Sequence, residues 1–578
     1  MDMVNIKIND KDYSVPASYT ILDAARDANI HIPTLCYLKD INQIGACRMC
    51  LVEIKGAKAL QAACVYPVSE GLEIYTNTTK VRNARRATLE LILSNHEKKC
   101  LTCVRNRNCE LQTLADELGI GELPYEGENV HYELDNTSTS LVRDNNKCIL
   151  CRRCVAACQN QQISVIGCAD RGFNTHITSS FEKNISEVGC IFCGQCIVSC
   201  PVGALYEKND IPKVVDALDD TSKHVVVQTA PAVRAALGEE FGLPIGTPVT
   251  GKMVAALRRL GFDKVFDTDT AADLTIMEEG TEFINRFTKQ ENLPIITSCS
   301  PGWVKFCEHY YPEFLGNLST CKSPMEMFGA VIKSYYAEKA GIDKENIFSV
   351  AIMPCTSKKF EASREEMGSD GIADIDVSLT TRELARMIKQ AGIDFVNLPD
   401  EEFDQPFGDA TGAGVIFGTT GGVMEAAIRT VYEILEKKPL DNLNVTAVRG
   451  LDGVKEATLQ IAGKDVRVAV AHGTKNAREV LERVKNGEHY DFIEIMACPG
   501  GCIHGGGQPI VDSRTKATVD VKAKRAAALY SEDEASTLRK SHENPNVQLM
   551  YKEYFGEPGG HKAHELLHTH YVDRSMSK

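Results

Sequence analysis

The side chains of this chain that are best suited to chemistry are its 22 cysteines. Four groups of them lie before residue 201, and a looser set runs from Cys299 to Cys502. The opening stretch MDMVNIKIND lacks the charged and apolar regions of a signal peptide, which predicts a cytoplasmic protein. Because thiols in a reducing compartment rarely form disulfides, so many cysteines indicate metal ligation.

Two of the groups share the spacing C-x₂-C-x₂-C-x₃-C, at residues 148–158 and 190–200. This spacing is typical of ferredoxins with two [4Fe–4S] clusters, in which the fourth cysteine of each run binds the other cluster. One cluster is therefore expected on Cys148, Cys151, Cys154 and Cys200. The second is expected on Cys190, Cys193, Cys196 and Cys158. Cys168 lies outside both runs and is expected to be an ordinary buried thiol.

The first group lies in a loop of a small predicted α+β domain. VNIKIND and YSVPA alternate like the strands of a hairpin, and TILDAARDANI has helical spacing. The stretch CYLKDINQIGACRMCLVEIKGAKALQAAC resembles plant-type ferredoxins, although its first spacing is longer, so a [2Fe–2S] cluster is expected. Its ligands would be Cys36, Cys47, Cys50 and Cys64. A zinc site is the alternative, but zinc ligands usually come as two close pairs.

The second group, HEKKCLTCVRNRNC, combines a histidine with three cysteines. It resembles the His-and-three-Cys [4Fe–4S] site found where electrons enter hydrogenases and respiratory complexes. The resemblance implies the ligands His96, Cys100, Cys103 and Cys109, with zinc again as the alternative. Together the four groups would form a chain of clusters that conducts electrons.

The elements that must position the later cysteines are strands and helices that alternate along residues 210–578. HVVVQTAP, NLPIITSCSPGW, IFSVAIMPC and HYDFIEIMAC contain apolar runs of strand length, and each ends in a loop. GKMVAALRRLGF, TTRELARMIKQAG and TGGVMEAAIRTVYEILEKK have helical spacing. This alternation predicts parallel sheets, whose ligands bind beyond the carboxyl ends of the strands.

Three of these loops carry cysteines that should converge on one point. TSCSPGW, MPCTSKKFE and EIMACPGGCIHGGGQP contain Cys299, Cys355, Cys498 and Cys502. The glycines of the third loop are expected to let the backbone pass close to a bulky inorganic cofactor.

These segments resemble the three signature motifs of [FeFe]-hydrogenases, and with the four upstream sites the resemblance covers essentially the whole chain. The order of the sites resembles that of the multi-cluster, monomeric clostridial type. The resemblance implies an H-cluster, which is a [4Fe–4S] cube joined through a cysteine sulfur to a diiron unit carrying CO, cyanide and azadithiolate. By motif position, Cys502 is the bridging ligand, and Cys355 and Cys498 bind the cube.

The motifs divide the chain into four predicted domains. A plant-ferredoxin-like [2Fe–2S] domain would span residues 1–79, and a His/Cys₃ [4Fe–4S] domain residues 80–126. A two-cluster ferredoxin domain would span residues 127–209, and the catalytic domain residues 210–578. The expected fold class is an α/β catalytic domain with parallel sheets around an H-cluster, preceded by α+β ferredoxin-like iron–sulfur domains.

The first motif departs from the family at one position. Where relatives carry two cysteines before PGW, this chain has Cys299 and Ser300. In the family, the second position supplies the fourth ligand of the cube and the first supplies the proton-carrying thiol. Either Ser300 binds iron through oxygen, or Cys299 ligates and no thiol remains to carry protons, or the cube is incomplete.

Acidic side chains should lead protons away from Cys299. In MEEGTEFINR, Glu279 and Glu282 are three residues apart and Arg286 follows four residues later, so that they share one face of a helix. Burial would raise the pKa of the carboxyl groups toward the working range of a proton carrier. Without the resemblance, Glu282 and Arg286 would be interpreted as a solvated salt bridge. The resemblance implies a relay through Cys299, Glu279, Ser319, Glu282 and Arg286.

Other residues match positions around the diiron unit in the family. Lys358 could donate to an anionic cyanide ligand, with a surface lysine as the alternative. Positions expected to contact or border the cofactor are Pro231, Ala232, Met325, Met353, Phe417 and Met496, several of which could also be plain core.

The composition agrees with this interpretation. A formal charge of −15 argues against a nucleic-acid partner, and no apolar run is long enough to cross a membrane. The expected function is reversible H₂ formation, with ferredoxin or a similar small carrier as electron partner and maturation proteins supplying the diiron unit. The alternatives are an H₂-sensing or non-catalytic iron–sulfur relative, favoured by Ser300, and an electron-transfer subunit of a respiratory-type complex.

Overall fold

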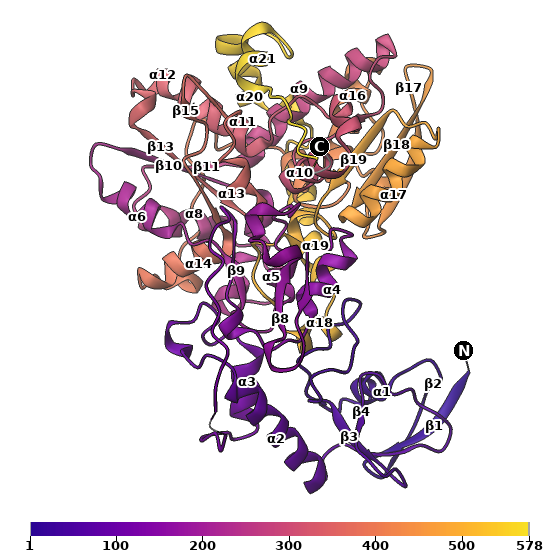
Figure 1. Ribbon diagram of the computed structural model, residues 1–578. Coiled ribbons are helices and arrows are strands. Elements are labelled where there is room, and N and C mark those ends of the chain that lie inside the picture. The colour runs from indigo at the N-terminus through magenta and orange to yellow at the C-terminus, as the bar shows by residue number, and fades with distance from the viewer. Residues whose placement is uncertain (1, 126, 576–578) are drawn as a thin grey trace.

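The computed structural model of the chain places the N-terminal region, which is predicted to bind iron–sulfur clusters, below a larger C-terminal region, the predicted catalytic part (Figure 1). The structure describes residues 2–125 and 127–575. The predicted domain boundary at residue 126 and the chain ends at 1 and 578 lie outside the described residues. Among the helices of the described ranges, none is both long and apolar enough to cross a membrane.

A five-stranded sheet forms the N-terminal domain, in the order β2-β1-β5-β3-β4. The predicted hairpin is present, because the first two strands pair antiparallel. Helix α1 (Ile21–Asp27) begins at a capping box in which Thr20 and Asp23 exchange hydrogen bonds. The strands are β1 (Met3–Ile8), β2 (Lys11–Pro16), β3 (Leu51–Ile54), β4 (Gln61–Ala62) and β5 (Glu73–Tyr75).

Helices flank or follow the next three cysteine groups. Helices α2 (Thr79–Ser94) and α3 (Glu110–Glu117) flank the second group. The third and fourth groups lead into α4 (Arg153–Asn160) and α5 (Gln195–Ser199), which contact each other.

Two small antiparallel ribbons complete this region. The first pairs β6 (Leu141–Arg143) with β9 (Leu205–Glu207), and the second pairs β7 (Ile166–Ala169) with β8 (His176–Ser179). Cys168 lies exposed on β7, so the prediction of a buried thiol is wrong. The two-stranded ribbon leaves this position uncovered.

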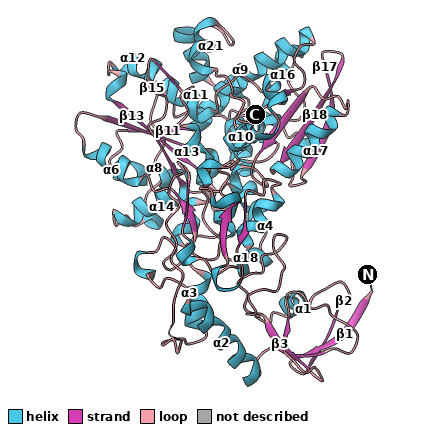
Figure 2. Ribbon diagram, in the orientation of Figure 1, coloured by secondary structure: helices cyan, strands magenta, loops and turns pink. Residues whose placement is uncertain are grey.

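Two four-stranded sheets form the catalytic part, on the left and right of its upper half in Figure 2. In the first sheet all neighbouring strands are parallel, in the order β11-β10-β13-β16. In the second sheet, in the order β12-β19-β18-β17, only the last pair is antiparallel. The predicted parallel sheets are therefore confirmed, with one antiparallel edge strand in addition. The strands are β10 (His224–Thr229), β11 (Lys264–Asp267), β12 (Ile295–Ile296), β13 (Ile347–Met353), β16 (Val377–Thr380), β17 (Val454–Ile461), β18 (Lys464–His472) and β19 (Phe492–Met496).

Apolar side chains hold helices against both sheets. Helices α8 (Thr250–Arg259) and α14 (Thr381–Gln390) share a core with the first sheet. Helices α9 (Thr268–Lys289) and α16 (Gly422–Glu436) share a core with the second. Because α9 also contacts α11 (Pro324–Val331), this long helix joins the two halves of the catalytic part.

The remaining helices and strands of the described residues complete the catalytic part. They are α6 (Ile211–Asp219), α7 (Pro231–Arg234), α10 (Pro301–Tyr310), α12 (Ala337–Ala340), α13 (Ser357–Glu361), α15 (Gly412–Val415), α17 (Thr474–Lys485), α18 (Ser513–Thr518), α19 (Val521–Ala535), α20 (Pro545–Met550), α21 (His561–Leu567), β14 (Gly368–Ser369) and β15 (Ile372–Ala373).

Candidate active site

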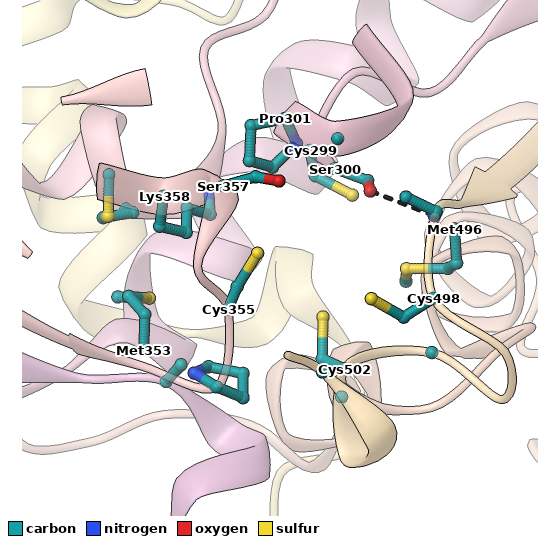
Figure 3. Close-up of a pocket in the computed structure, with 18 of the residues that line it drawn as sticks. Cys299, Ser300, Pro301, Met353, Cys355, Ser357, Lys358, Met496, Cys498 and Cys502 are labelled. Atoms are coloured by element: carbon teal, nitrogen blue, oxygen red, sulfur yellow. Dashed lines mark hydrogen bonds between the residues drawn. The ribbon is translucent and has the colours of Figure 1, made fainter. Parts of the chain in front are cut away.

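Strands from both sheets lead into one pocket. Strands β10 and β13 lead into Pro231 and Cys355, while β12 and β19 lead into Cys299 and Cys498. The pocket lies between these loops, and the labelled cysteine sulfurs point into it (Figure 3). The structure therefore brings together Cys299, Ser300, Cys355, Cys498 and Cys502.

The glycines of the loop after β19 allow close contacts between backbones. A Cβ atom at Gly505 would lie 2.1 Å from the carbonyl oxygen of Pro354, and one at Gly506 would lie 2.3 Å from that of Cys193. Gly501 adopts a φ of 95°, a backbone conformation that other residues rarely adopt. The expectation that these glycines make room for a cofactor therefore covers only part of their role. They also let three cysteine loops pack backbone against backbone.

Cys299 and Ser300 face different neighbours. The backbone at Ser300 is extended, so that side chains next to each other in the sequence point to opposite sides. The hydroxyl of Ser300 accepts a hydrogen bond from the N–H of Ala497, with Oγ and N 3.2 Å apart. Burial raises the pKa of the Cys299 thiol well above its usual value, and the charge of Glu279 raises it further. The hydroxyl thus lies beside the loop of Cys498, while the thiol is near enough to Glu279 for the charge of that residue to raise its pKa.

The other three thiols of the pocket lie near one another. Burial raises the pKa of Cys355, Cys498 and Cys502, to about 12 for the last of them. A charge on Cys355 raises the pKa of both other thiols further. A bound metal cation would reverse these shifts, because cysteine ligates metals as the thiolate.

The fourth cysteine group packs directly against the pocket. The hydroxyl of Thr356 donates to the carbonyl oxygen of Phe192 at 2.6 Å, and that of Ser357 donates to the carbonyl oxygen of Ile191 at 2.7 Å. Cys193, which the fourth group contributes, lines the pocket itself. A cluster in this loop would be next to one in the pocket.

The two cysteine runs of the ferredoxin region interlock. Cys148, Cys151, Cys154 and Cys200 line one small pocket. The charge of Cys158 contributes to the raised pKa of the three thiols in the other run, which are those of Cys190, Cys193 and Cys196. The fourth cysteine of each run therefore lies beside the other run.

The cysteines of the N-terminal domain are linked through their sulfur atoms. The N–H of Cys36 donates to Sγ of Cys47 at 3.3 Å, and the N–H of Cys47 donates to Sγ of Cys36 at 3.5 Å. Hydrogen bonds to Cys36 and Cys50 raise the pKa of Cys64. The four thiols are thus close neighbours in a single loop region.

His96 lies in the turn after α2, ahead of Cys100, Cys103 and Cys109. Its Nδ1 atom is buried and has no hydrogen-bond partner among the described residues. Burial lowers the pKa of the ring, which favours its neutral, ligating form. A metal ion is a partner that would satisfy this nitrogen.

Glu282 connects the residues expected to carry protons. Its carboxylate accepts hydrogen bonds from the hydroxyl of Ser319 at 2.8 Å and from the guanidinium of Arg286 at 2.6 Å. The N–H of Thr320 donates to it at 3.0 Å, a contact that the sequence did not indicate. The side chains of Glu282 and Arg286 are only 14% and 13% exposed, so the pair is not a solvated surface salt bridge.

Glu279 lies one helical turn before Glu282 and is fully buried. Neither oxygen of its carboxyl group has a hydrogen-bond partner among the described side chains and backbone groups. Burial raises its pKa to about 8, and the charge of Glu282 contributes to the shift. A carboxyl group with this pKa can take up and release a proton near neutral pH.

Lys358 is buried at the edge of the pocket, which excludes the alternative of a surface lysine. Its Nζ donates to Oγ of Ser323 and to Oε2 of Glu361, both at 2.6 Å. Burial opposes the charge of the lysine, but Glu361, together with Glu326 and Cys355, outweighs this effect and raises its pKa. The sequence analysis missed both partners, although Glu361 follows Lys358 by three residues on α13.

The wall of the pocket is mostly apolar. The expected residues that line it are Pro231, Met325, Met353, Phe417 and Met496. Ala232 differs from the expectation, because it packs in a separate core with Leu529 and is not among the lining residues. The helix α7 begins at Pro231, so the next side chain turns away from the pocket.

Thiols, a hydroxyl and apolar walls in one pocket form a donor set that fits iron–sulfur chemistry. The buried and unpartnered nitrogen of His96 and the raised thiol pKa values are consistent with ligands that need a cation. The residues therefore fit both the H-cluster and the accessory clusters that the sequence implied.

Known families match the chain along most of its length. The family "Iron only hydrogenase large subunit, C-terminal domain" matches residues 223–506, and "Iron hydrogenase small subunit" matches residues 519–574. Upstream, the matches are a 2Fe-2S iron-sulfur cluster binding domain at 1–79, the NADH-ubiquinone oxidoreductase-G iron-sulfur binding region at 85–124 and a 4Fe-4S dicluster domain at 147–204.

Whole relatives are similar over almost the full chain. NADP-reducing hydrogenase subunit HndD of Solidesulfovibrio fructosivorans is 50% identical over 99% of this chain and 100% of its own length. Iron hydrogenase 1 of Clostridium pasteurianum is 44% identical over 98% of this chain and 100% of its own length. The solved structure of the [FeFe]-hydrogenase HydA(deltaEFG) is 44% identical, with a TM-score of 0.57, and covers 64% of this chain and 100% of its own.

The fold and the pocket define an iron–sulfur enzyme of hydrogen metabolism. The chain belongs to the [FeFe]-hydrogenase family, of the multi-cluster clostridial type. It catalyses the reversible formation of H₂ from protons and electrons at an H-cluster, and [2Fe–2S] and [4Fe–4S] clusters conduct the electrons.

Proposed function

We propose that Cys355 and Cys498 bind the cube of the H-cluster, that Cys502 bridges it to the diiron unit, and that Ser300 completes the cube through oxygen. The position of Ser300 beside Ala497 supports this assignment, since Ala497 directly precedes Cys498. When bound, the H-cluster supplies the metal centre at which protons and electrons combine to H₂.

Cys299 is then free to carry protons between the pocket and Glu279. The charge of Glu279 acts on this thiol more strongly than that of any other residue, which supports their proximity. Beyond Glu279, the proton would pass to Ser319, whose hydroxyl acts on the pKa of Glu279 and donates a hydrogen bond to Glu282. Arg286 holds Glu282 in place. The pKa of Glu279, at about 8, allows it to exchange protons in both directions.

Lys358 is proposed to donate a hydrogen bond to a cyanide ligand of the diiron unit. Glu361 and Ser323 fix its ammonium group and keep it charged, because burial alone would favour the neutral amine. The apolar side chains of Met325, Met353 and Phe417 would exclude water around the cofactor.

The accessory ligands are proposed to be those that the cysteine spacing implied. The [2Fe–2S] cluster would be held by Cys36, Cys47, Cys50 and Cys64. The first [4Fe–4S] cluster would be held by His96, Cys100, Cys103 and Cys109. The other two would be held by the interlocked runs, with Cys200 and Cys158 exchanged between them.

We further propose a ferredoxin or a similar small carrier as the electron partner, in the cytoplasm. The [2Fe–2S] domain lies at the lower end of the molecule in Figure 1, far from the catalytic sheets, and so offers a first acceptor for an external carrier. Maturation proteins would supply the diiron unit, since its CO and cyanide ligands require dedicated synthesis.

One observation carries this function: the ends of four strands bring Cys299, Ser300, Cys355, Cys498 and Cys502 into a single pocket. The test is to produce the protein with and without the maturation proteins and to record iron content, infrared spectra and H₂ formation. Only the matured protein should show CO and cyanide bands and form H₂. H₂ formation by the unmatured protein, or a matured protein without these bands, would overturn the assignment.

A further inference from the structure

Three potential metal ligands meet at the outer end of the proposed relay. They are Glu282 on α9, Cys321 just before α11 and His568 directly after α21. We propose that these three side chains form a binding site for a thiophilic divalent cation such as Zn²⁺ or Cd²⁺. This site is separate from the pocket and from all of the proposed iron ligands.

The backbone holds two of the three ligands in register. Cys321 and His568 form an antiparallel β-bridge, so they lie directly opposite each other. Hydrogen bonds extend the pairing on both sides: Thr569 N–H donates to Thr320 at 2.7 Å, and Lys322 N–H donates to Leu567 at 2.8 Å. The thiol and the imidazole are therefore positioned by the chain itself and not by flexible loops.

The donor atoms are close enough for one cation. All three lie within 4.8 Å of one another, and Sγ of Cys321 is 4.0 Å from Oε2 of Glu282. Around a tetrahedral zinc ion, with bonds of about 2.3 Å to sulfur and 2.0–2.1 Å to nitrogen or oxygen, ligand atoms are roughly 3.5 Å apart. Small side-chain rotations would bring the three donor atoms from their present separations to the roughly 3.5 Å that a zinc ion requires.

A carboxylate orients the imidazole in the way that metal sites require. Nε2 of His568 lies 3.0 Å from Oε2 of Glu278. The same oxygen accepts a hydrogen bond from the N–H of Gly559 at 2.8 Å, and Oε1 of Glu278 accepts one from the hydroxyl of Tyr551. An Nε2–H bonded to this carboxylate leaves Nδ1 with a free electron pair. Carboxylate–histidine pairs of this kind are common behind metal-ligating histidines.

The charges around the site favour a divalent cation, which would replace some of the existing hydrogen bonds. The carboxyl groups of Glu278 and Glu282 face the site, against the single guanidinium of Arg286 on Oε1 of Glu282. Nδ1 of His568 now bonds Oγ1 of Thr320 at 2.8 Å, so this hydroxyl or a water molecule is at hand as the fourth ligand. Binding converts the Cys321 thiol to a thiolate, and its proton leaves to solvent.

Occupancy would interrupt proton transfer, a consequence that depends on the proposed relay. A Glu282 carboxylate bound to a cation cannot accept a proton from Ser319. We therefore expect zinc to slow H₂ formation by roughly 10²-fold or more, in the range by which a positioned proton carrier accelerates a reaction.

Zinc K-edge X-ray absorption on the matured holoenzyme with one equivalent of Zn²⁺ tests the site directly. The expected spectrum has one sulfur neighbour at about 2.3 Å and nitrogen or oxygen neighbours at about 2.0–2.1 Å. Cys321→Ser should lose the sulfur neighbour and His568→Gln should weaken binding, while the control Cys168→Ser, at an exposed thiol outside the site, should bind as the unmodified protein does. Zinc that does not bind, or that has four sulfur neighbours from displaced cluster ligands, would overturn the proposal.

Activity measurements separate the site from the relay. Cys321→Ser should keep the basal rate of H₂ formation. It should raise the inhibitory zinc concentration by at least the roughly 10–100-fold that loss of an outer-shell partner typically costs, because Cys321 is a direct ligand. Unchanged zinc inhibition in both Cys321→Ser and His568→Gln would refute the site. If zinc binds with the expected neighbours and turnover does not change, the site is correct and the relay through Glu282 is wrong.

Discussion

The hydroxyl of Ser300 accepts a hydrogen bond from the backbone N–H of Ala497, and their Oγ and N atoms are 3.2 Å apart. This bond directs the side chain toward the loop that carries Cys498, whereas burial and the charge of Glu279 raise the pKa of the adjacent Cys299 thiol. Under the assignment proposed above, Ser300 binds the iron–sulfur cube, and the adjacent Cys299 carries protons.

Ser300→Cys should keep the iron content and make the midpoint potential of the H-cluster cube less negative. An oxygen ligand is harder than a thiolate and favours the more oxidised iron, so its replacement by sulfur stabilises the reduced state. Redox titration followed by electron paramagnetic resonance would measure the shift. Ser300→Ala is the matched control, because it removes the donor atom. An Ala variant with the same cube spectrum and iron content as the unmodified protein would show that Ser300 is not a ligand.

Cys299→Ala should retain the iron and the CO bands but lower the rate of H₂ formation by about 10²–10⁴-fold, because a methyl group cannot transfer protons. Iron analysis, infrared spectroscopy and turnover on one preparation would check this. Cys307→Ala is a suitable control, since this thiol is also buried on α10 but does not line the pocket. Loss of iron in Cys299→Ala would contradict the prediction and would make Cys299 a ligand of the cube.

Glu279→Gln should flatten the dependence of stability on pH. The folded-state pKa of Glu279 is raised from 4.5 to about 8, mainly by burial. Its neutral form contributes stability that is fully present below pH about 4.5 and is lost as pH rises to about 8, on the order of a few kcal/mol. Because glutamine does not ionise, the variant should gain apparent Tm over the unmodified protein from pH 6 to 8, and this gain should level off above pH 8. If the apparent Tm of the variant and of the unmodified protein changed with pH in parallel over this range, the pKa assignment would be wrong.

Deletion of residues 1–79 should remove about two irons, which is the content of one [2Fe–2S] cluster. It should leave H₂ formation from reduced viologen largely intact. None of the described residues of this domain lines the pocket, and its polar contacts with the rest, such as that of the Asn42 side chain with the carbonyl oxygen of Cys151 at 3.1 Å, lie outside the pocket. Electron transfer from reduced ferredoxin should become markedly slower. An unchanged ferredoxin rate would mean that electrons enter elsewhere.

A longer deletion through residue 209 should also lower the apparent Tm of the catalytic part. It removes the carbonyl groups of Ile191 and Phe192, which accept hydrogen bonds from Ser357 and Thr356 beside the pocket. The hydroxyl groups would then be left without these partners, at a typical cost of about 1–3 kcal/mol each where they stay buried. The longer deletion is the control for the shorter one, which leaves these hydrogen bonds in place and should not lower the apparent Tm of the catalytic part in this way.

The sequence by itself determined the chemistry of this protein, because metal ligation depends on residue type and short spacing. The repeated C-x₂-C-x₂-C-x₃-C runs predict [4Fe–4S] clusters without any knowledge of long-range contacts. Alternating strands and helices likewise predicted parallel sheets with the cysteine loops at their carboxyl ends, since periodicity is a local property.

Only the tertiary structure decided which way individual side chains point and what they meet. Burial of Lys358 against Glu361, exposure of Cys168 and the absence of Ala232 from the pocket wall all depend on packing between distant segments. The pairing of Cys321 with His568 has no sequence signal at all, because a β-bridge joins residues through backbone hydrogen bonds that any side chain permits. Spacing along the chain therefore specifies the ligands, and packing in space specifies their partners.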